Sequence, residues 1–254
     1  MFRIQKDLVQ HRFEKAFASY GEHASLQQAM SHTLFAQWQS HAPQVASLLE
    51  LGCGTGNLSR LLAHLPDLQT LYLNDLCAAS ACLSHEFTGR LHSEFISGDM
   101  DSIAFPSHLD AVLSSSALQW SQDLPALLAK ISASLKPHGW LAFASFGPSH
   151  YQEIKALTGI GLHYPSLADI TQCLQADFDL LWQCETPHTQ DFANPMAVLQ
   201  HMRQTGVSGI SKQAWTKTKL QAFCHDYQAT YATADGGVCL SQHPLYLIAR
   251  KKVS

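Results

Sequence analysis

The stretch Leu48-Leu49-Glu50-Leu51-Gly52-Cys53-Gly54-Thr55-Gly56-Asn57-Leu58 decides the fold. An apolar run ends near an acid, three glycines alternate, and an amphipathic segment then begins. This order predicts a buried strand, a tight turn and the start of a helix. Glycine permits a positive φ in the turn and lets a ligand approach the backbone closely. Because the first amides of a helix lack intrahelical partners, we expect the turn to favour a bound anion.

A second acid lies where a nucleoside-binding fold needs one. Asp75 follows an apolar run about twenty residues beyond the glycines, and a carboxylate there can accept hydrogen bonds from both ribose hydroxyls. The dinucleotide pattern G-x-G-x-x-G requires glycine at position 57, where this chain has Asn57. The pattern present, E-x-G-x-G-x-G, resembles motif I of the class I S-adenosylmethionine (SAM) methyltransferases, with Glu50 able to pair with the SAM ammonium. The alternative is a structural glycine turn in another α/β protein.

The composition indicates a globular protein with a substantial core. Of 254 residues, 46% are hydrophobic, and no apolar run reaches the roughly 18 residues that span a bilayer. Residues 1–10 lack the apolar region of a signal peptide. We therefore expect one large domain, or a domain with an insertion, in the cytoplasm and without a membrane partner. The formal net charge of -4 argues against general nucleic-acid binding.

The cysteines and histidines argue against a metal centre. The seven cysteines are irregularly spaced and include no C-x-x-C pair, which favours reduced thiols over disulfides or zinc ligands. The fifteen histidines include no H-x-x-x-H or H-E-x-x-H pattern. We therefore predict no metal and expect core or surface roles for the histidines.

Strands and helices alternate after residue 43, which predicts a parallel, doubly wound sheet. The expected strands are 47–51, 70–74, 95–97, 109–114 and 140–145. The expected helices are 57–65, 76–86 and 124–135, with a turn over 136–139. After residue 146 the alternation is weaker. Helices are expected at 151–157, 167–174, 196–204 and up to Tyr227. Strands are expected at 178–185 and 238–249, and they would form a late antiparallel pair.

The carboxyl ends of the expected strands carry the candidate donor site, because ligands of such sheets bind outside those ends. Asp99 suits a hydrogen bond to an adenine amino group, although a turn role is the alternative, and Met100 can offer its backbone N–H. The segment Ser114–Trp120 follows strand four, where donor and acceptor should meet. The candidate cofactor-binding residues are Glu50, Gly52, Cys53, Gly54, Gly56, Asn74, Asp75, Leu76, Asp99, Met100, Ser115 and Ser116.

Residues 5–38 show helical periodicity twice, with Gly21 expected to interrupt it. This lead-in either covers the sheet or forms a lid over the cofactor. Tyr20 and His23 would lie at the break between the helices, where side chains can turn towards a ligand. Trp120 is a candidate for the same site or a core anchor.

Beyond motif I, the chain resembles the malonyl-acyl carrier protein O-methyltransferases of biotin synthesis. The similar segments span nearly the whole chain: VQHRFEKAF (9–17) with Ser19-Tyr20, His23-Ala24 and Leu26-Gln27, then ALQW (117–120), 143–148, LQHMRQTGVSG (199–209) and HPLY (243–246). The block around Arg203 and the first block are the discriminating ones. One departure is Leu240-Ser241-Gln242-His243, where the family usually has Leu-Thr-Tyr-His; Gln242 is either a change in the acyl pocket or a surface difference.

The resemblance implies a Rossmann-like α/β fold: a seven-stranded class I methyltransferase sheet, mostly parallel, with one antiparallel strand near the C-terminus. It implies a helical lid (1–42), a SAM-binding core (43–146), an insertion that shapes substrate choice (147–212), and a closing helix and strand (213–254). The implied reaction moves the SAM methyl group to the free carboxyl of a malonyl thioester. Tyr20, His23 and Trp120 would wall the site, and Arg203 would hold the malonyl group or face the carrier protein.

The implied partner is an acidic acyl carrier protein carrying the malonyl group, or malonyl-CoA. A docking patch for the carrier protein is expected at Arg203, Lys155, Lys212, Lys217 and Lys219, unless these are scattered solvated side chains. Two other interpretations stay open at this point. One is a SAM methyltransferase acting on another small carboxylic acid or a quinone precursor. The other is a protein of a different class, either a SAM-binding protein without catalysis or a nicotinamide oxidoreductase. Asn57 disfavours the oxidoreductase.

Overall fold

The structure is a computed structural model that describes residues 5–205 and 216–253. The chain forms two compact units. The core unit comprises residues 25–145, 166–185 and 245–254, and the accessory unit comprises residues 1–24, 146–165 and 186–244.

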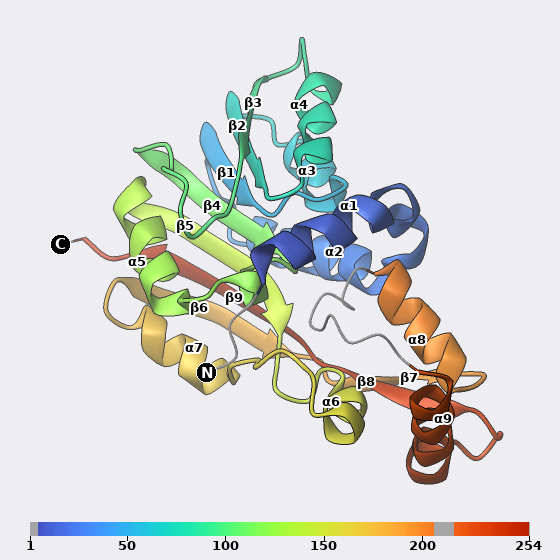
Figure 1. Cartoon of the computed structure of the whole chain (residues 1–254). Helices are drawn as coiled ribbons and strands as arrows, with labels where there is room; N and C mark the ends of the chain where they lie inside the picture. Colours follow the sequence, from blue (N-terminus) through green and yellow to red (C-terminus); the bar gives the residue numbers. More distant parts are fainter. Residues whose placement is uncertain (1–4, 206–215, 254) are drawn as a thin grey trace. The chain divides into compact units, whose positions relative to one another are not determined.

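The core unit is built on a seven-stranded sheet with the order β3-β2-β1-β4-β5-β9-β6 (Figure 1). Its strands are β1 Ser47–Leu51, β2 Thr70–Asp75, β3 His92–Ser97, β4 Leu109–Ser115, β5 Leu135–Phe146, β6 Phe178–Glu185 and β9 Pro244–Lys251. The first five pair in parallel, and β6 pairs antiparallel with β9. The expected class I methyltransferase sheet is therefore confirmed.

Helices cover both faces of this sheet. They are α2 Ser25–Gln39, α3 Asn57–Leu62, α4 Cys82–Glu86, α5 Leu124–Ser134 and α7 Leu167–Leu174, with short 3-10 helices at Ala78–Ala81 and Leu118–Trp120. Leu49 and Leu51 of β1 join one hydrophobic cluster with the apolar residues of α5 and α7. Side chains alternate along a strand, so Glu50 points to the opposite face, where α2 packs against α3.

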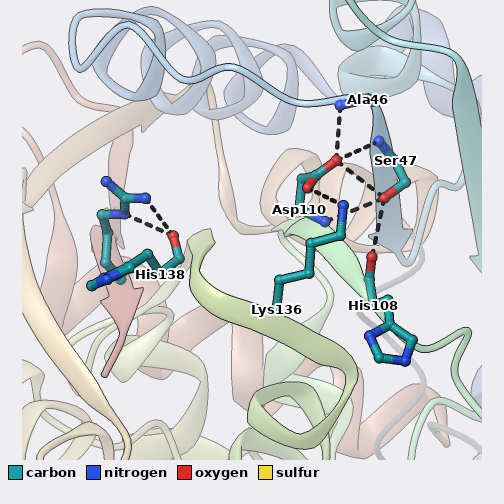
Figure 2. Close-up of polar contacts among 7 residues, drawn as sticks. Ala46, Ser47, His108, Asp110, Lys136 and His138 are labelled. Carbon is teal, nitrogen blue, oxygen red and sulfur yellow. Dashed lines mark hydrogen bonds and ion pairs between the residues drawn. The ribbon is translucent and has the colours of Figure 1, made fainter. Parts of the chain in front are cut away.

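An aspartate fixes the amino edge of the sheet (Figure 2). Asp110 Oδ2 accepts the backbone N–H groups of Ala46 and Ser47, each at 2.9 Å, and Asp110 Oδ1 lies 2.6 Å from Lys136 Nζ. Although burial opposes ionisation, these hydrogen bonds lower the pKa of Asp110. The network joins the beginning of β1 to β4 and β5.

The same region corrects one expectation. Residues 136–139 were expected to form a turn before the fifth strand, but they form an irregularity within β5, where the register shifts between Leu109 and Ala111. Arg250 holds this bulge by donating to the carbonyl of His138 at 2.6 and 2.8 Å. Because β4 pairs with β5 at Leu135 and again from Trp140 onwards, the strand continues through the extra residues.

The accessory unit contains α1 Lys6–His23, α6 Gln152–Thr158, α8 Pro195–Gln204 and α9 Lys217–Tyr231, with a two-stranded sheet of β7 His188–Phe192 and β8 Val238–Gln242. Its core gathers the buried residues of α6, α8, α9 and β8, including Tyr151, Val198 and Tyr227. None of the helices within the described residues is long and apolar enough to cross a membrane.

Three expectations about these segments were wrong. Helix α1 runs through Gly21 to His23, since a helix tolerates an interior glycine at a cost of about 1 kcal/mol. The expected strand 238–249 is two strands in different sheets, because β8 pairs with β7 while β9 joins the large sheet. Strand β7 was not predicted, since its sequence HTQDF is polar and half exposed.

The two units divide the chain differently from the expected segments. Helix α2 belongs to the core unit rather than to a lid with α1. Residues 166–185 also belong to the core unit, because β6 pairs with β9 at the edge of the large sheet.

Candidate functional site

The glycine loop lies between β1 and α3, as its sequence predicts, and four of its N–H groups donate within the protein. The N–H groups of Gly52 and Cys53 donate to Asn74 O at 2.8 and 2.9 Å, and that of Gly56 donates to Cys53 O at 2.9 Å. The Gly54 N–H donates to Asp75 Oδ2 at 2.7 Å. These four N–H groups are therefore not available to an anion, and the expectation that the first amides of α3 favour one stays a prediction.

The glycines of the loop serve different needs. A Cβ at Gly52 would lie 2.1 Å from Ala117 Cβ, and one at Gly56 would lie 2.6 Å from Leu83 Cδ2. These two positions require glycine because neighbouring segments pack directly on the backbone. Gly54, with φ of +51°, has nothing within 4 Å of such a Cβ, so the loop presents an open backbone surface there.

Asp75 and Asn74 support the loop from the end of β2. The two carboxylate oxygens of Asp75 accept the N–H groups of Gly54 and Cys77, both at 2.7 Å. Burial raises the pKa of Asp75 and these hydrogen bonds oppose the rise. Asn74 is buried, and its amide donates to Ile96 O and Gly98 O at 2.8 and 2.9 Å. Its side chain thus joins β2 to the end of β3, and Leu76 follows as a half-buried residue.

Glu50 is the most perturbed acid of the loop. It is 1% exposed, and its Oε2 has no hydrogen-bond partner among the described residues. Burial raises its pKa to about 8; the nearby Ser59 hydroxyl and, more weakly, Arg60 oppose this rise, and repulsion by Asp75 adds to it. Burial also raises the pKa of the Cys53 thiol in the loop. A buried acid oxygen without a partner at a strand end is an environment for a cationic ligand group.

The segment after β3 is a tight turn held by α5 and by the segment after β4. Asp99 Oδ1 accepts the N–H of Asp101 at 3.1 Å, so Asp99 does form a turn. Lys130 Nζ donates to Met100 O at 2.7 Å. Asp101 accepts the Ser121 hydroxyl at 2.7 Å and the Gln122 N–H at 2.9 Å. The adenine candidates Asp99 and Met100 therefore lie on a loop tied to the one that carries Trp120.

The end of β4 carries three serines in different roles. Ser114 Oγ donates to Leu51 O at 2.8 Å, which closes β4 onto β1. Ser115 Oγ accepts from Ser31 of α2 at 3.0 Å. Ser116 has a φ of 57°, a conformation that is uncommon for residues other than glycine and concentrates at functional sites. Trp120, in the following 3-10 helix, is 8% exposed.

Unsatisfied polar atoms gather at this edge of the core unit. Among the described residues, Gln27 Oε1, Glu50 Oε2, Thr55 Oγ1 and Asn74 Oδ1 are buried without a hydrogen-bond partner. Buried polar groups are normally paired, so such a concentration indicates a place for a polar ligand or water. The expected donor residues are thus brought together at the carboxyl ends of β1, β2, β3 and β4.

The expected acceptor residues are less completely described. Tyr20 and His23 lie in the last turns of α1, and their side chains lie outside the described part of the structure. Arg203 of α8 is exposed, as are Lys155, Lys217 and Lys219, whereas Lys212 lies outside the described residues.

The accessory unit contains a buried aromatic cluster that sequence reasoning missed. The ring of His150 stacks on Phe146 and on Tyr151, each at 3.9 Å between centroids, and meets the edge of Tyr164 at 5.3 Å. Burial lowers the pKa of His150 to about 3, so the ring is neutral. The mixed sequence around residue 150 gives no periodic signal for this cluster. Gln242 is buried and donates to Gln190 Oε1 at 2.6 Å, so it is not a surface difference.

Glu153 fixes the segment that carries this cluster. It is 2% exposed, and its carboxylate accepts both the backbone N–H and the hydroxyl of Ser241. Within the described part of the chain, no three or more His, Cys, Asp or Glu side chains are grouped so that they could hold a metal.

Comparisons with known proteins identify the family of the chain. The family profile described as "Methyltransferase domain" matches residues 49–143, which include the loop, β2 to β4 and most of β1 and β5. A malonyl-[acyl-carrier protein] O-methyltransferase of Acinetobacter baylyi is 39% identical over 98% of this chain and 98% of its own length. A protein of the same name from Bacteroides fragilis is 36% identical over 97% of this chain, which spans only 51% of that longer protein.

Solved structures share the fold at low identity. The YcgJ protein from Bacillus subtilis has a TM-score of 0.60 with 13% identity and covers 88% of this chain and 100% of its own. The N-methyltransferase NodS from Bradyrhizobium japonicum, solved with S-adenosyl-L-homocysteine, has a TM-score of 0.52 with 14% identity over 87% of this chain and 85% of its own. With the full-length relatives, these findings establish that the chain belongs to the malonyl-[acyl-carrier protein] O-methyltransferase family.

Proposed function

We propose that this protein transfers the methyl group of SAM to the free carboxyl of a malonyl thioester carried by an acyl carrier protein. The product is a methyl ester whose negative charge has been removed, which suits it as a primer for pimeloyl synthesis on the way to biotin. SAM as the methyl donor is supported by the buried Glu50 at the end of β1, whose Oε2 has no hydrogen-bond partner among the described residues. The malonyl group as the acceptor is supported by the full-length relatives, because their names specify it.

The residues of the core unit fit SAM in three places. Glu50 would accept the ammonium of the methionine end, and a neighbouring cation would return its pKa towards the ordinary range. Asp75 would accept the ribose hydroxyls through oxygen lone pairs that Gly54 and Cys77 leave available. Asp99 and Met100 would hold the adenine.

The reaction needs alignment more than proton transfer. A malonyl carboxylate is already ionised at neutral pH, so the displacement at the methyl group requires no general base. The protein has to align the carboxylate oxygen, the methyl carbon and the sulfur, and exclude water from the carboxylate. We propose that Trp120 borders this site, and the family resemblance makes Tyr20 and His23 the candidates for enclosing the malonyl carboxylate and Arg203 the candidate for holding the malonyl group or facing the carrier protein.

The exposed cations suit an acidic partner. Arg203, Lys155, Lys217 and Lys219 are exposed in the accessory unit and can attract an acidic carrier protein without being buried. None of the seven cysteines, all of them within the described residues, is in a disulfide, which fits a reducing compartment, and we propose that the protein acts in the cytoplasm.

The experiment is a comparison of acceptors under one set of conditions. The protein is incubated with SAM and, separately, with malonyl-carrier protein, malonyl-CoA, succinyl-carrier protein and a free dicarboxylic acid. Release of S-adenosyl-L-homocysteine gives the rate in each case. The proposal predicts turnover with the malonyl thioesters and little with the others. Faster turnover of another acid would overturn the proposed acceptor, and no turnover with any acceptor despite SAM binding would favour a SAM-binding protein without catalysis.

A further inference from the structure

The methionine end of SAM carries a carboxylate as well as an ammonium, and four of the N–H groups of the glycine loop are not available to this carboxylate. The loop amides of Gly52, Cys53, Gly54 and Gly56 already donate within the protein. Glu50 is an acid, so it accepts from the ammonium and repels the carboxylate. If the proposed use of SAM is right, a further group on this face of the sheet has to provide a donor.

Helix α2 runs over this face with its beginning at the carboxyl ends of the strands. Ser31 contacts Ser115 at the end of β4 at 3.0 Å, and Met30 Sδ accepts from the next residue, Ser116, at 3.6 Å. Seven residues after Ser31, Trp38 meets the edge of Trp140, which pairs with Ala111 near the start of β4. The helix is therefore antiparallel to β4.

Gln27 lies one turn before Ser31 on the same side of α2. The buried face of the helix is Gln27, Met30, Ser31, Leu34 and Trp38. At 1.5 Å per residue, Gln27 lies about 6 Å further along the axis than Ser31, in the direction of the carboxyl edge. Glu50 points to the face that α2 and α3 cover, so both residues are on the same face of the sheet near the same edge.

A purely structural role does not explain why the buried residue at position 27 is a glutamine. It is 6% exposed, and its Oε1 is buried without a hydrogen-bond partner among the described residues. A leucine or methionine would fill the same space without an unsatisfied polar atom. A carboxamide offers one acceptor and two donors, which match an ammonium and a carboxylate on one carbon atom.

We propose that Gln27 of α2 binds the amino-acid end of SAM beside Glu50, accepting from the ammonium and donating to the carboxylate. Ser31 and Met30 position it by fixing α2 on Ser115 and Ser116. This binding role of Gln27 differs from the role of α2 in covering the sheet, because binding depends on the polar atoms of the Gln27 side chain and covering depends only on its volume.

The test separates the two ends of the ligand. Binding of S-adenosyl-L-homocysteine, which has the amino-acid end, and of 5′-methylthioadenosine, which lacks it, is measured by calorimetry for Gln27→Met. The matched control is Gln28→Met, because Gln28 is the neighbouring residue of α2 and is exposed. The proposal predicts at least a tenfold loss for S-adenosyl-L-homocysteine with Gln27→Met, less than a twofold change for 5′-methylthioadenosine, and no change with Gln28→Met.

Equal losses for both ligands, or no loss for either, would overturn the role of Gln27. If the wild-type protein bound 5′-methylthioadenosine but not S-adenosyl-L-homocysteine, the proposal would also fail. If the wild-type protein bound neither ligand, the proposed use of SAM itself would be wrong, which distinguishes that failure from an error about Gln27. If Gln27→Met does not fold, Gln27→Glu provides a second variant, since it retains the shape of the side chain and an acceptor but loses the donors. Gln27→Glu should show the same selective loss of affinity for S-adenosyl-L-homocysteine.

Discussion

Replacing Glu50 with glutamine should stabilise the ligand-free protein at neutral pH and weaken its binding of SAM. Glu50 is 1% exposed, and burial raises its pKa from 4.5 to about 8. Between these two pH values the folded state keeps a proton that the unfolded state has released. The free energy of unfolding therefore falls as the pH rises through this window, and the contribution of Glu50 is unfavourable there.

The magnitude follows from the difference between the two pKa values. At pH 7 the unfolded carboxyl group is about 2.5 pH units above its pKa, whereas the folded group is still mostly protonated. At about 1.4 kcal/mol per unit, Glu50 lowers the free energy of unfolding by about 3 kcal/mol. Glutamine has the same shape and does not ionise, so Glu50→Gln should recover most of this amount.

The assay is urea unfolding of the ligand-free wild type and Glu50→Gln at pH 5 and pH 7. We expect the variant to be more stable by about 3 kcal/mol at pH 7 and by less than about 1 kcal/mol at pH 5. The same variant should bind S-adenosyl-L-homocysteine at least tenfold more weakly at pH 7, because the ammonium loses its partner. A stability difference independent of pH would refute the raised pKa, and unchanged affinity would refute the contact with the ammonium.

Three further perturbations test the site and the sheet that carries it. Asp75→Ala should weaken S-adenosyl-L-homocysteine binding at least tenfold, about 1.4 kcal/mol, because the carboxylate supports Gly54 and would hold the ribose; unchanged affinity in calorimetry would place the ribose elsewhere. Gly52→Ala should lower the Tm, because its Cβ would lie 2.1 Å from Ala117 Cβ. Adding Ala117→Gly should recover part of the lost Tm. If the double variant is no more stable than Gly52→Ala, this clash is not the cause of the loss. Asp110→Ala should cost roughly 2 kcal/mol at pH 7 in urea unfolding. Because the folded pKa of Asp110 is lowered, this contribution is present above its ordinary pKa and lost as the pH falls through the folded one, so a cost that persists in strong acid would contradict the network with Lys136.

The regular part of the core unit could be predicted from the sequence because its signals are local. Strand β1 has the bounds that its apolar run predicts, and β6 has those that its apolar alternation predicts. The late segments depend on pairing between distant residues. Nothing local separates β8 from β9, since both are apolar, and only the partners of each strand assign them to different sheets.

The positions of the candidate donor residues in the fold could be predicted to a similar extent, and for the same reason. Parallel strands end at one edge, so Glu50, Asp75 and Asp99 come together without knowledge of the packing. The partners of the loop amides could not be predicted, because they depend on how Asn74 and Asp75 at the end of β2 meet the loop. Gln27 was missed because its burial depends on how α2 packs across β4, which helical periodicity alone does not specify.

The most direct test of the proposed reaction is to locate the transferred methyl group. The protein is incubated with SAM labelled with carbon-13 at the methyl group and with malonyl-carrier protein, and the acyl group is examined by tandem mass spectrometry and carbon-13 NMR. The proposal predicts one labelled methyl ester on the free carboxyl of the malonyl group. A label on the methylene carbon, on the carrier protein itself or on no part of the product would contradict it.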